Sequence, residues 1–230
     1  MSNIGFRVFS KINRPEKAVV EQYKELPVAN IADVMNRSRV LSARIKKIGK
    51  NNLLGVAFTV RTRAGDNLMV HKALQMALPG DVIIVDACGD TTNAIMGELM
   101  VRTAEQKKLA GIIIDGAIRD VAVLSSLDIP VYASGVTPAG PFKDGPGEIN
   151  IPISVGGVVV NPGDIIVGDD DGVVIINADV AQDVFEKAKE KNDKESELIN
   201  LIKEGRRDNS WIDKTLESKK CEIIDGYYND

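Results

Sequence analysis

The chain has 230 residues, a formal net charge of −4, two cysteines and one histidine. This length suffices for one sizeable hydrophobic core, and no Pro/Ser-rich linker divides the sequence. The acidic balance and the lack of a Lys/Arg cluster with interleaved aromatic residues argue against a nucleic-acid-binding surface. Cys88 and Cys221 are distant and have neither a CxxC spacing nor a histidine cluster, so the pattern indicates neither zinc nor a disulfide framework.

The apolar segments of the chain are short. The N-terminal residues lack the apolar core of a signal peptide, and no apolar run approaches the ~20 residues that span a bilayer. We therefore expect a cytoplasmic protein with no membrane partner.

Helix and strand patterns alternate in the first part of the chain. The expected elements are helices at 16–26 and 31–36, a strand at 55–61, a helix ending at 77, a strand at 81–86 and a loop at 87–94. Asn30 is expected to cap the second helix, and Asp66 or Asn67 the third. Pro79-Gly80 ends that third helix.

Residues 96–120 read MGELMVRTAEQKKLAGIIIDGAIRD and carry two helix starts around one buried strand. A helix is expected from Gly97 to Ala110, followed by an apolar strand at 112–114. Asp115-Gly116 is expected to turn the chain off that strand. Arg119-Asp120 then opens the next helix, through residue 124.

The pair Arg119-Asp120 is the strongest candidate for a ligand site. Backbone N–H groups at a helix start attract anions, and an arginine beside a carboxylate can hold an anionic substrate together with a metal cation. An isolated Arg-Asp pair is more often structural, because Asp favours the first helical turn. The surrounding run favours a site for a small carboxylated molecule.

Strands and turns dominate the later part of the chain. A strand is expected at 131–133 and several between 149 and 177, with Asp171-Gly172 in a tight hairpin. A long charged helix at 178–205 and a shorter one at 211–219 follow. This order predicts one α/β domain over 1–188, layered as a sandwich with a mixed sheet, and a charged helical C-terminal extension over 189–230.

Other candidate motifs are weaker. The acidic cluster 169–171 lacks the spacing of a calcium loop, so a turn is expected there. His71 lies mid-helix without a second imidazole, and a packing or capping role is favoured. No dinucleotide or Walker sequence is present. Asp86 and Asp115 are expected at the ends of strands, where ligand-facing residues of open sheets gather. Each could support residues that contact a ligand, but the preference of Asp for turns explains both positions about as well.

Several motifs in order resemble one family. They are 65–68 (GDNL), 79–86 (PGDVIIVD), 97–100 (GELM), 115–120 (DGAIRD), 156–164 (GGVVVNPGD) and 169–174 (DDDGVV). Together, over roughly 26–188, they resemble the 4-hydroxy-4-methyl-2-oxoglutarate aldolase family, which also contains the regulator of ribonuclease activity A. Older labels call some members dimethylmenaquinone methyltransferases.

The resemblance implies a fold and an assembly. The fold is the swivelling β/β/α type, in which the strand-rich portion forms a smaller sheet. The assembly is a homotrimer or a dimer of trimers with the site at a subunit junction. A glutamate of a neighbouring subunit can contribute to that site in the family, and this sequence does not place it.

The lysines argue for a metal-dependent route. A Schiff-base aldolase needs a lysine in a desolvated pocket. The lysines here lie in polar runs such as Lys46-Lys47 and Lys107-Lys108, and none ends a buried strand. Mg²⁺ or Mn²⁺ favours oxygen ligands and is often held by only one or two protein carboxylates.

The resemblance also implies residue roles. Asp120 stands where the family binds the divalent cation, and Arg119 where the keto-acid end is contacted. The backbone amides of Gly97, Glu98, Leu99 and Met100 match the loop that receives the pyruvoyl carboxylate. Glu98 matches an acidic position, often aspartate, that orients or deprotonates a metal-bound water.

We therefore expect a metal-dependent lyase that cleaves 4-hydroxy-4-methyl-2-oxoglutarate-type 2-keto acids to pyruvate. Oxaloacetate decarboxylation is expected at the same site, because both reactions leave the same pyruvate enolate. The alternatives are a non-catalytic protein-binding regulator of ribonuclease activity and a lyase for another 2-keto acid.

Overall fold

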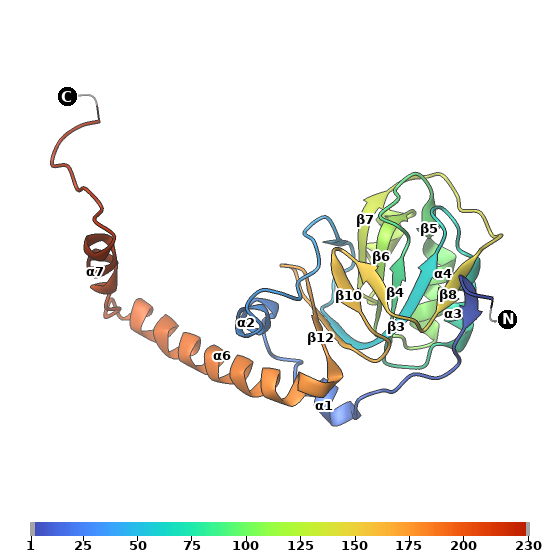
Figure 1. Cartoon of the computed structure of the whole chain (residues 1–230), viewed down its shortest axis with the longest axis horizontal. Coiled ribbons are helices and arrows are strands. Elements are labelled where there is room, and N and C mark those ends of the chain that lie inside the picture. The colour runs from blue at the N-terminus through green and yellow to red at the C-terminus, as the bar shows by residue number, and fades with distance from the viewer. Residues whose placement is uncertain (1–2, 229–230) are drawn as a thin grey trace. The chain divides into compact units, whose positions relative to one another are not determined.

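The computed structural model describes residues 3–228, which divide into two compact units between Glu190 and Lys191 (Figure 1). The prediction of one α/β domain over 1–188 with a charged helical C-terminal extension over 189–230 stays a prediction. Among the described residues, no helix is both long and apolar enough to cross a membrane.

A large mixed sheet forms the first unit. Within the described chain it has ten strands, and its main path runs β1-β8-β3-β4-β6-β7-β2, with β11 pairing with β3 and β12, and β5 with β6. These strands are β1 (Phe6–Val8), β2 (Lys46–Lys47), β3 (Leu53–Thr62), β4 (Asp81–Asp86), β5 (Ala94–Met96), β6 (Gly111–Ile118), β7 (Val131–Val136), β8 (Gly147–Ile149), β11 (Ile165–Gly168) and β12 (Val173–Ile176).

The central strands β3, β4, β6 and β7 are parallel neighbours, and their middle residues are buried on both faces of the sheet. Ile83 and Val85 of β4 pack in one core, whereas Val82 and Ile84 pack in the other. This alternation follows from the two-residue period of a strand. It explains why β4 reads as a continuous apolar run.

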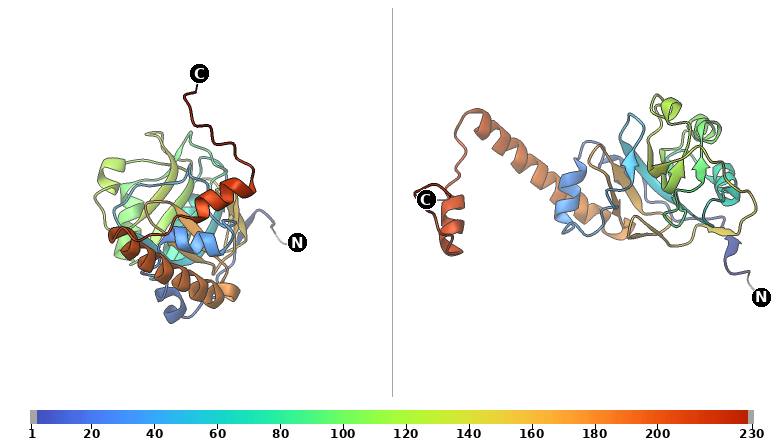
Figure 2. Two further views of the ribbon diagram at one scale, coloured as in Figure 1. Left: turned by 90° about the vertical axis from the view of Figure 1, so that its left-hand side faces the viewer. Right: turned by 90° about the horizontal axis from the view of Figure 1, so that it is seen from above.

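Helices cover one face of this sheet and a small sheet covers the other (Figure 1 and Figure 2). The helices are α3 (Leu68–Met76), α4 (Glu98–Gln106) and α5 (Val121–Leu124). The small sheet is the antiparallel pair β9 (Ile153–Val155) and β10 (Val158–Val160). The layered α/β fold is thereby confirmed, although β8, β11 and β12 of the strand-rich portion join the large sheet.

A third cluster of buried apolar side chains packs against β11 and β12. It holds α1 (Lys17–Glu21), α2 (Val28–Val34) and the start of α6 (Ala181–Lys203), which follows the short 3-10 turn η1 (Ala178–Val180). Asn30 lies inside α2, so the prediction that it caps this helix is wrong. Pro27 precedes the helix, and the N–H of Val28 donates to the carboxylate of Asp169 at 3.1 Å. The acidic turn between β11 and β12 thus caps a helix from a distance.

Two boundaries near the candidate site also differ from expectation. β6 continues through Asp115-Gly116 to Ile118, so the expected turn is absent. Asp115 is buried and accepts hydrogen bonds from Arg44, Ser134 and the backbone of Gly156, which satisfy a carboxylate inside the sheet. The strand can therefore continue to Ile118, which places Arg119 and Asp120 at its C-terminal end.

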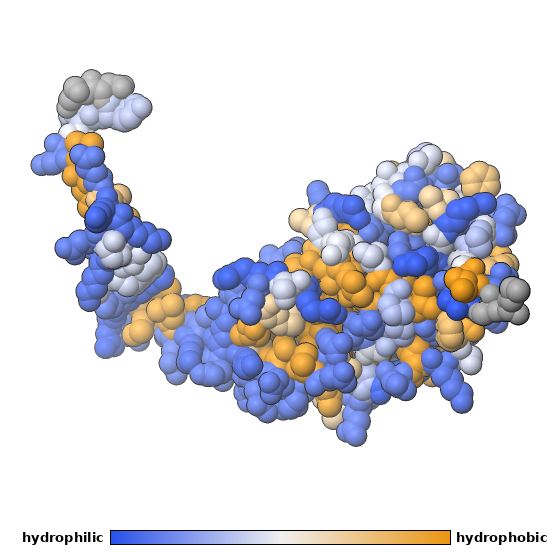
Figure 3. All heavy atoms as spheres, in the orientation of Figure 1, coloured by the Kyte–Doolittle hydropathy of each residue, from blue (hydrophilic) through white to orange (hydrophobic). Residues whose placement is uncertain are grey.

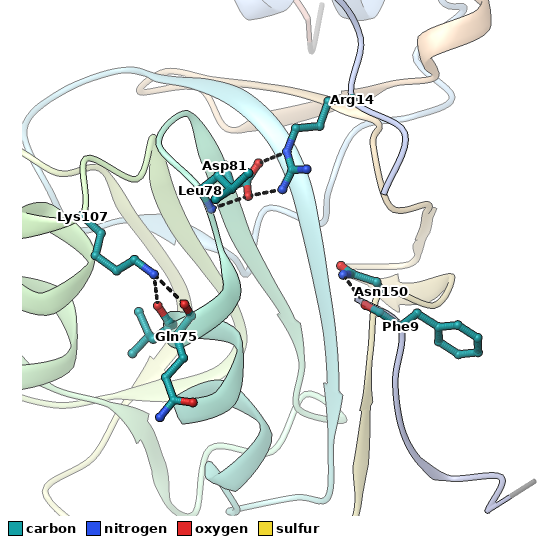
Figure 4. Close-up of polar contacts among 8 residues, drawn as sticks. Phe9, Arg14, Gln75, Leu78, Asp81, Lys107 and Asn150 are labelled. Atoms are coloured by element: carbon teal, nitrogen blue, oxygen red, sulfur yellow. Dashed lines mark hydrogen bonds and ion pairs between the residues drawn. The ribbon is translucent and has the colours of Figure 1, made fainter. Parts of the chain in front are cut away.

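α4 ends at Gln106 rather than at Ala110, because Lys108 adopts a left-handed φ of 58°. The side chain of Lys107 turns back to the last turn of α3, where its Nζ donates to the carbonyls of Leu74 and Gln75 at 2.6 and 2.9 Å (Figure 4). A lysine at this place satisfies helix-end carbonyls and complements the helix dipole.

The N-terminal segment is fastened along the sheet. Arg14 forms two hydrogen bonds to the buried carboxylate of Asp81, at 2.8 and 2.7 Å, and the amide of Asn150 donates to the carbonyl of Phe9 at 2.8 Å (Figure 4). The bidentate geometry between guanidinium and carboxylate fixes both groups.

The second unit contains the end of α6 and α7 (Trp211–Ser218). Its surface is mainly hydrophilic with interspersed apolar patches (Figure 3). The exposed apolar side chains of these helices are Leu198, Ile199, Leu201, Ile202, Trp211 and Ile212.

Candidate functional site

A cavity of about 350 Å³ opens where α3, the β5–α4 junction and the residues before α5 meet. Its lining includes all the residues that the sequence analysis placed at the site: Gly97, Glu98, Leu99, Met100, Arg119 and Asp120. β5 and β6 are parallel neighbours, so their ends bring the two helix starts together. Segments about 22 residues apart in sequence thus form one wall.

Asp120 has a special backbone and an unusual partner. Its φ and ψ of 62° and 32° lie in the left-handed region, which Asp tolerates better than most residues. Its carboxylate makes no capping bond to α5, although Asp120 is the residue before that helix. Oδ2 instead accepts the N–H of Glu98, the first residue of α4, at 2.9 Å. The carboxylate is therefore turned into the cavity.

Gly97 makes this contact possible. Its φ of −145° is ordinary extended backbone, so no left-handed conformation requires glycine. A Cβ at this position would lie 2.4 Å from Oδ2 of Asp120 and 2.9 Å from Cγ of Arg119. Glycine is needed because the Arg119-Asp120 pair fills the space that a side chain would occupy.

Arg119 is held by its backbone, whereas its guanidinium is only loosely paired. Its N–H donates to the carbonyl of Met96 at 3.0 Å, which continues the pairing of β5 with β6. Its Nε lies 3.7 Å from Oδ2 of Asp120, and both side chains are about half exposed. Such a loose pair leaves guanidinium donors for a ligand.

The start of α4 offers backbone donors. The N–H of Glu98 donates to Asp120 and that of Met100 to the carbonyl of Gly97, whereas that of Leu99 has no acceptor in the described part of the chain. The Leu99 side chain is 82% exposed. Because first-turn amides lack helical partners, this segment can accept an anion.

The carboxylate of Glu98 faces along its own helix. Oε1 accepts Nε of Arg102 at 2.7 Å, one helical turn away. This i,i+4 pair lies at the edge of the cavity, with both side chains partly exposed. The general-base role of Glu98 stays a prediction.

Three further polar side chains line the cavity: Asn67, His71 and Lys143. Burial and the positive charge of Lys143 lower the pKa of His71. The expected role of His71 is packing or capping, but its position four residues after Asn67 places both residues on one face of the helix, and this spacing is a signal for a place in the cavity. Lys143 lies in a loop, and no periodicity marks it.

The side chain of Asn67 joins α3 to the segment before α4. Its Nδ2 donates to the carbonyl of Ile95 at 2.9 Å and contacts Sδ of Met100 at 3.4 Å. Its Oδ1 is buried and has no hydrogen-bond partner among the described residues. Asn67 therefore links the two helices in the wall of the cavity.

Other candidates lie outside this lining. Asp115 is saturated within the sheet, and Asp86 accepts the N–H of Cys88 at 3.1 Å in a turn. The side chain of Lys47 is only 9% exposed, but its Nζ lies 2.8 Å from Asp170. No group of three or more His, Cys, Asp or Glu within residues 3–228 is arranged to hold a metal.

Comparisons with known proteins agree with this architecture. A family model described as "RraA-like: Aldolase/RraA" matches residues 28–175. A protein of Halalkalibacterium halodurans, named "Putative 4-hydroxy-4-methyl-2-oxoglutarate aldolase", is 41% identical over 181 residues, which cover 78% of this chain and 86% of that protein. A Bacillus cereus protein of the same name is 35% identical over 141 residues, or 61% of this chain and 88% of that one.

Among solved structures, Streptomyces coelicolor RraAS2 is described as "an unusual member of the RNase ES inhibitor RraA protein family". It has a TM-score of 0.73 and 27% identity, and the match covers 81% of this chain and 98% of that one. The family model spans more than half of the chain, and the Halalkalibacterium protein is similar over most of its length. This chain therefore belongs to the aldolase/RraA family.

Proposed function

We propose that this protein is a divalent-metal-dependent lyase that cleaves 4-hydroxy-2-keto acids such as 4-hydroxy-4-methyl-2-oxoglutarate to pyruvate. The observation that carries the proposal is the convergence of Arg119, Asp120 and the start of α4 in one cavity, with Gly97 leaving room for the pair. The names of the two bacterial relatives support the same reaction class.

The donors in the cavity fit Mg²⁺ or Mn²⁺. Asp120 offers a half-exposed carboxylate, and only its Oδ2 is engaged by the backbone. Hard divalent cations take oxygen ligands, keep several waters and often use one or two protein carboxylates. Asp120 would hold the cation, which when bound supplies positive charge to the oxygens of a 2-keto acid.

The remaining residues bind and orient the substrate. The amide of Leu99 at the start of α4, which has no acceptor among the described residues, receives the carboxylate next to the keto group, and Arg119 donates to the keto oxygen. When the C3–C4 bond breaks, its electron pair moves into the pyruvate fragment as an enolate, whose negative charge Arg119 partly neutralises. A proton then adds to C3 and gives pyruvate.

Cleavage also requires removal of the 4-hydroxyl proton, as C4 becomes a carbonyl carbon. Glu98 is the proposed base, held at the cavity edge by Arg102. Loss of CO₂ from oxaloacetate gives the same enolate without this deprotonation. The site therefore supports both reactions, and Glu98→Gln is expected to slow cleavage more than decarboxylation.

The lysine in the cavity fits a Schiff-base route poorly. Lys143 is exposed, whereas a Schiff-base lysine is activated by desolvation or by a neighbouring cation that leaves it neutral. A metal-dependent route is therefore preferred over a covalent one.

The test is pyruvate release from 4-hydroxy-4-methyl-2-oxoglutarate and from oxaloacetate, with Mg²⁺, with Mn²⁺ and with excess EDTA. We expect turnover with either metal and none with the chelator. Full activity in EDTA, or covalent trapping of substrate by borohydride, contradicts the metal-dependent route.

A protein-binding regulator of ribonuclease activity is the second candidate, and the similarity to Streptomyces coelicolor RraAS2, a member of an RNase ES inhibitor family, favours it. A fold shared by both kinds of protein does not choose between them. Absence of turnover on either substrate, together with inhibition of a ribonuclease E-type enzyme by the purified chain, would favour this candidate. Turnover on a different 2-keto acid would instead retain the lyase and change its substrate.

We also propose a homotrimer or a dimer of trimers with sites at subunit contacts. The exposed apolar residues of the second unit support an oligomer, because they are candidates for burial by another copy. Light scattering is expected to give three or six chains per particle. A stable, fully active monomer contradicts this assembly.

A further inference from the structure

The charges around the cavity are incompletely paired. Arg119 lies beside Asp120, and Glu98 is paired with Arg102. Lys143 also lines the cavity but has no carboxylate within salt-bridge distance in the part of the chain that the structure describes. A cation without an internal partner is available to an anionic group of a ligand.

The backbone around Lys143 is held firmly in place. The buried carboxylate of Asp66 accepts the N–H groups of Asp144 and Gly145 at 2.7 and 2.9 Å. On the other side, the backbone of Phe142 pairs with the turn before α3, both as donor and as acceptor. The lysine therefore extends from a fixed point, which reduces the ordering needed to bind a ligand.

His71 adds a neutral hydrogen-bonding group. It lines the same cavity from α3, and both its burial and the charge of Lys143 lower its pKa. The imidazole is therefore neutral near pH 7 and has one N–H to donate. One cation and one neutral donor are suited to a single carboxylate.

We propose that Lys143 and His71 form the subsite for the distal carboxylate of a 4-hydroxy-2-keto diacid. This inference rests on the proposed function, in which Arg119 and the start of α4 bind the keto-acid end. A diacid then contacts two separate groups of donors, and Lys143 makes the protein select diacids over monoacids.

The two proposed reactions respond differently to such a subsite. In aldol cleavage the distal carboxylate remains on the ketone product, so its contact with Lys143 persists through the transition state. In decarboxylation of oxaloacetate the distal carboxylate itself leaves as neutral CO₂. A cation that grips it would stabilise the ground state more than the transition state. Lys143 therefore promotes cleavage of the diacid and does not promote decarboxylation.

The test compares kcat/KM for 4-hydroxy-4-methyl-2-oxoglutarate and for 4-hydroxy-2-oxopentanoate, which lacks the distal carboxylate. Lys143→Met is expected to lower the value for the diacid by about tenfold or more, the effect of losing one charge-assisted hydrogen bond. The monoacid value and the rate on oxaloacetate should not fall. Lys143→Arg should restore much of the diacid preference.

Lys72→Met is the matched control, because Lys72 is an exposed lysine of α3 outside the cavity lining. It removes the same charge and should leave the diacid-to-monoacid ratio unchanged. If Lys143→Met has the same diacid-to-monoacid ratio of kcat/KM as the parent, the proposed subsite is wrong. Equal loss of all three activities in Lys143→Met also overturns it, since that pattern assigns the lysine to a common step.

Binding separates this inference from the proposed function. Calorimetry with 2-oxoglutarate and with pyruvate, both in Mg²⁺, requires no turnover. A catalytically inactive parent that binds the diacid more tightly, with the difference lost in Lys143→Met, refutes the lyase and supports the subsite. Equal affinities of the parent for the two acids count against the subsite even if pyruvate release is found.

Discussion

The starts of α3 and α4 border the same cavity, and a carboxylate accepts a first-turn amide of each helix. At α3 the carboxylate is that of Asp66, close in sequence and fully buried, which accepts Leu68 as well as the backbone of 144–145. At α4 it comes from Asp120, whose side chain is 41% exposed and, within residues 3–228, accepts a hydrogen bond only from the amide of Glu98, with Nε of Arg119 3.7 Å away.

The difference separates a structural carboxylate from one that is available to a ligand. Both carboxylate oxygens of Asp66 accept hydrogen bonds from the protein, and removal of this side chain would leave three backbone amides without that acceptor. Asp120 keeps acceptor capacity that faces the cavity. Substitution at the first position should therefore change stability, and substitution at the second should change metal binding and turnover.

The largest expected effect is that of Asp120→Ala. It removes the proposed cation ligand, so turnover should fall on the order of a thousandfold, as the loss of several kcal/mol of charge stabilisation implies. Calorimetry should show no Mg²⁺ or Mn²⁺ binding at the site. Asp120→Asn removes the negative charge alone, because asparagine tolerates the left-handed backbone and its side-chain oxygen can still accept the N–H of Glu98.

Asp66→Ala is the matched opposite. Loss of this carboxylate should lower the free energy of unfolding by roughly 3–5 kcal/mol, because three backbone amides, one of them in a buried hydrogen bond, lose their acceptor. Urea denaturation measures this change. The comparison fails if Asp120→Ala binds metal and turns over like the parent, or if Asp66→Ala is as stable as the parent.

Gly97→Ala should have the next largest effect. Its Cβ would lie 2.4 Å from Oδ2 of Asp120, so the carboxylate must move, and a displacement of about 1 Å can cost on the order of a hundredfold in rate. Steady-state kinetics beside a thermal melt should show the rate falling more than the stability. Gly140→Ala is a milder companion: its Cβ would meet only the far end of the Arg119 side chain, with Nη1 at 3.3 Å, so it tests the placement of the guanidinium without displacing Asp120.

Arg119→Lys should lower kcat/KM by about tenfold or more, which corresponds to about 1.4 kcal/mol of transition-state stabilisation. Lysine keeps the charge but loses the planar fork that grips two oxygens at once. Metal binding should be preserved, which distinguishes Arg119 from its neighbour Asp120. Loss of metal affinity in this variant would mean that the two side chains do not have separate roles.

The smallest expected effect is that of Arg102→Met. It breaks an exposed ion pair with Glu98 that contributes about 0.3–0.5 kcal/mol, so the unfolding midpoint should scarcely change. A selective fall in aldol cleavage would show that the pair orients Glu98. Unchanged cleavage would show that this contact has no part in catalysis.

The local patterns predicted much of the scaffold. The apolar run of β4 and the hairpin at Asp171-Gly172 follow from short-range rules, and both are found. Errors occurred where a distant group decided the outcome. Asn30 has the chemistry of a cap, but α2 is capped by the carboxylate of Asp169. Asp115-Gly116 has the composition of a turn, but Arg44 and Ser134 satisfy Asp115 within the sheet.

The sequence alone determined that Gly97, Arg119 and Asp120 stand at two helix starts, because helix starts and buried strands leave marks within a few residues. Only the tertiary structure decided that Asp120 turns away from its own helix to α4, and that His71 and Lys143 line the same cavity. Those facts depend on the pairing of β5 with β6 and on the anchoring of loop 142–145 by Asp66. Contacts between segments distant in sequence arise from packing, and no local periodicity encodes them.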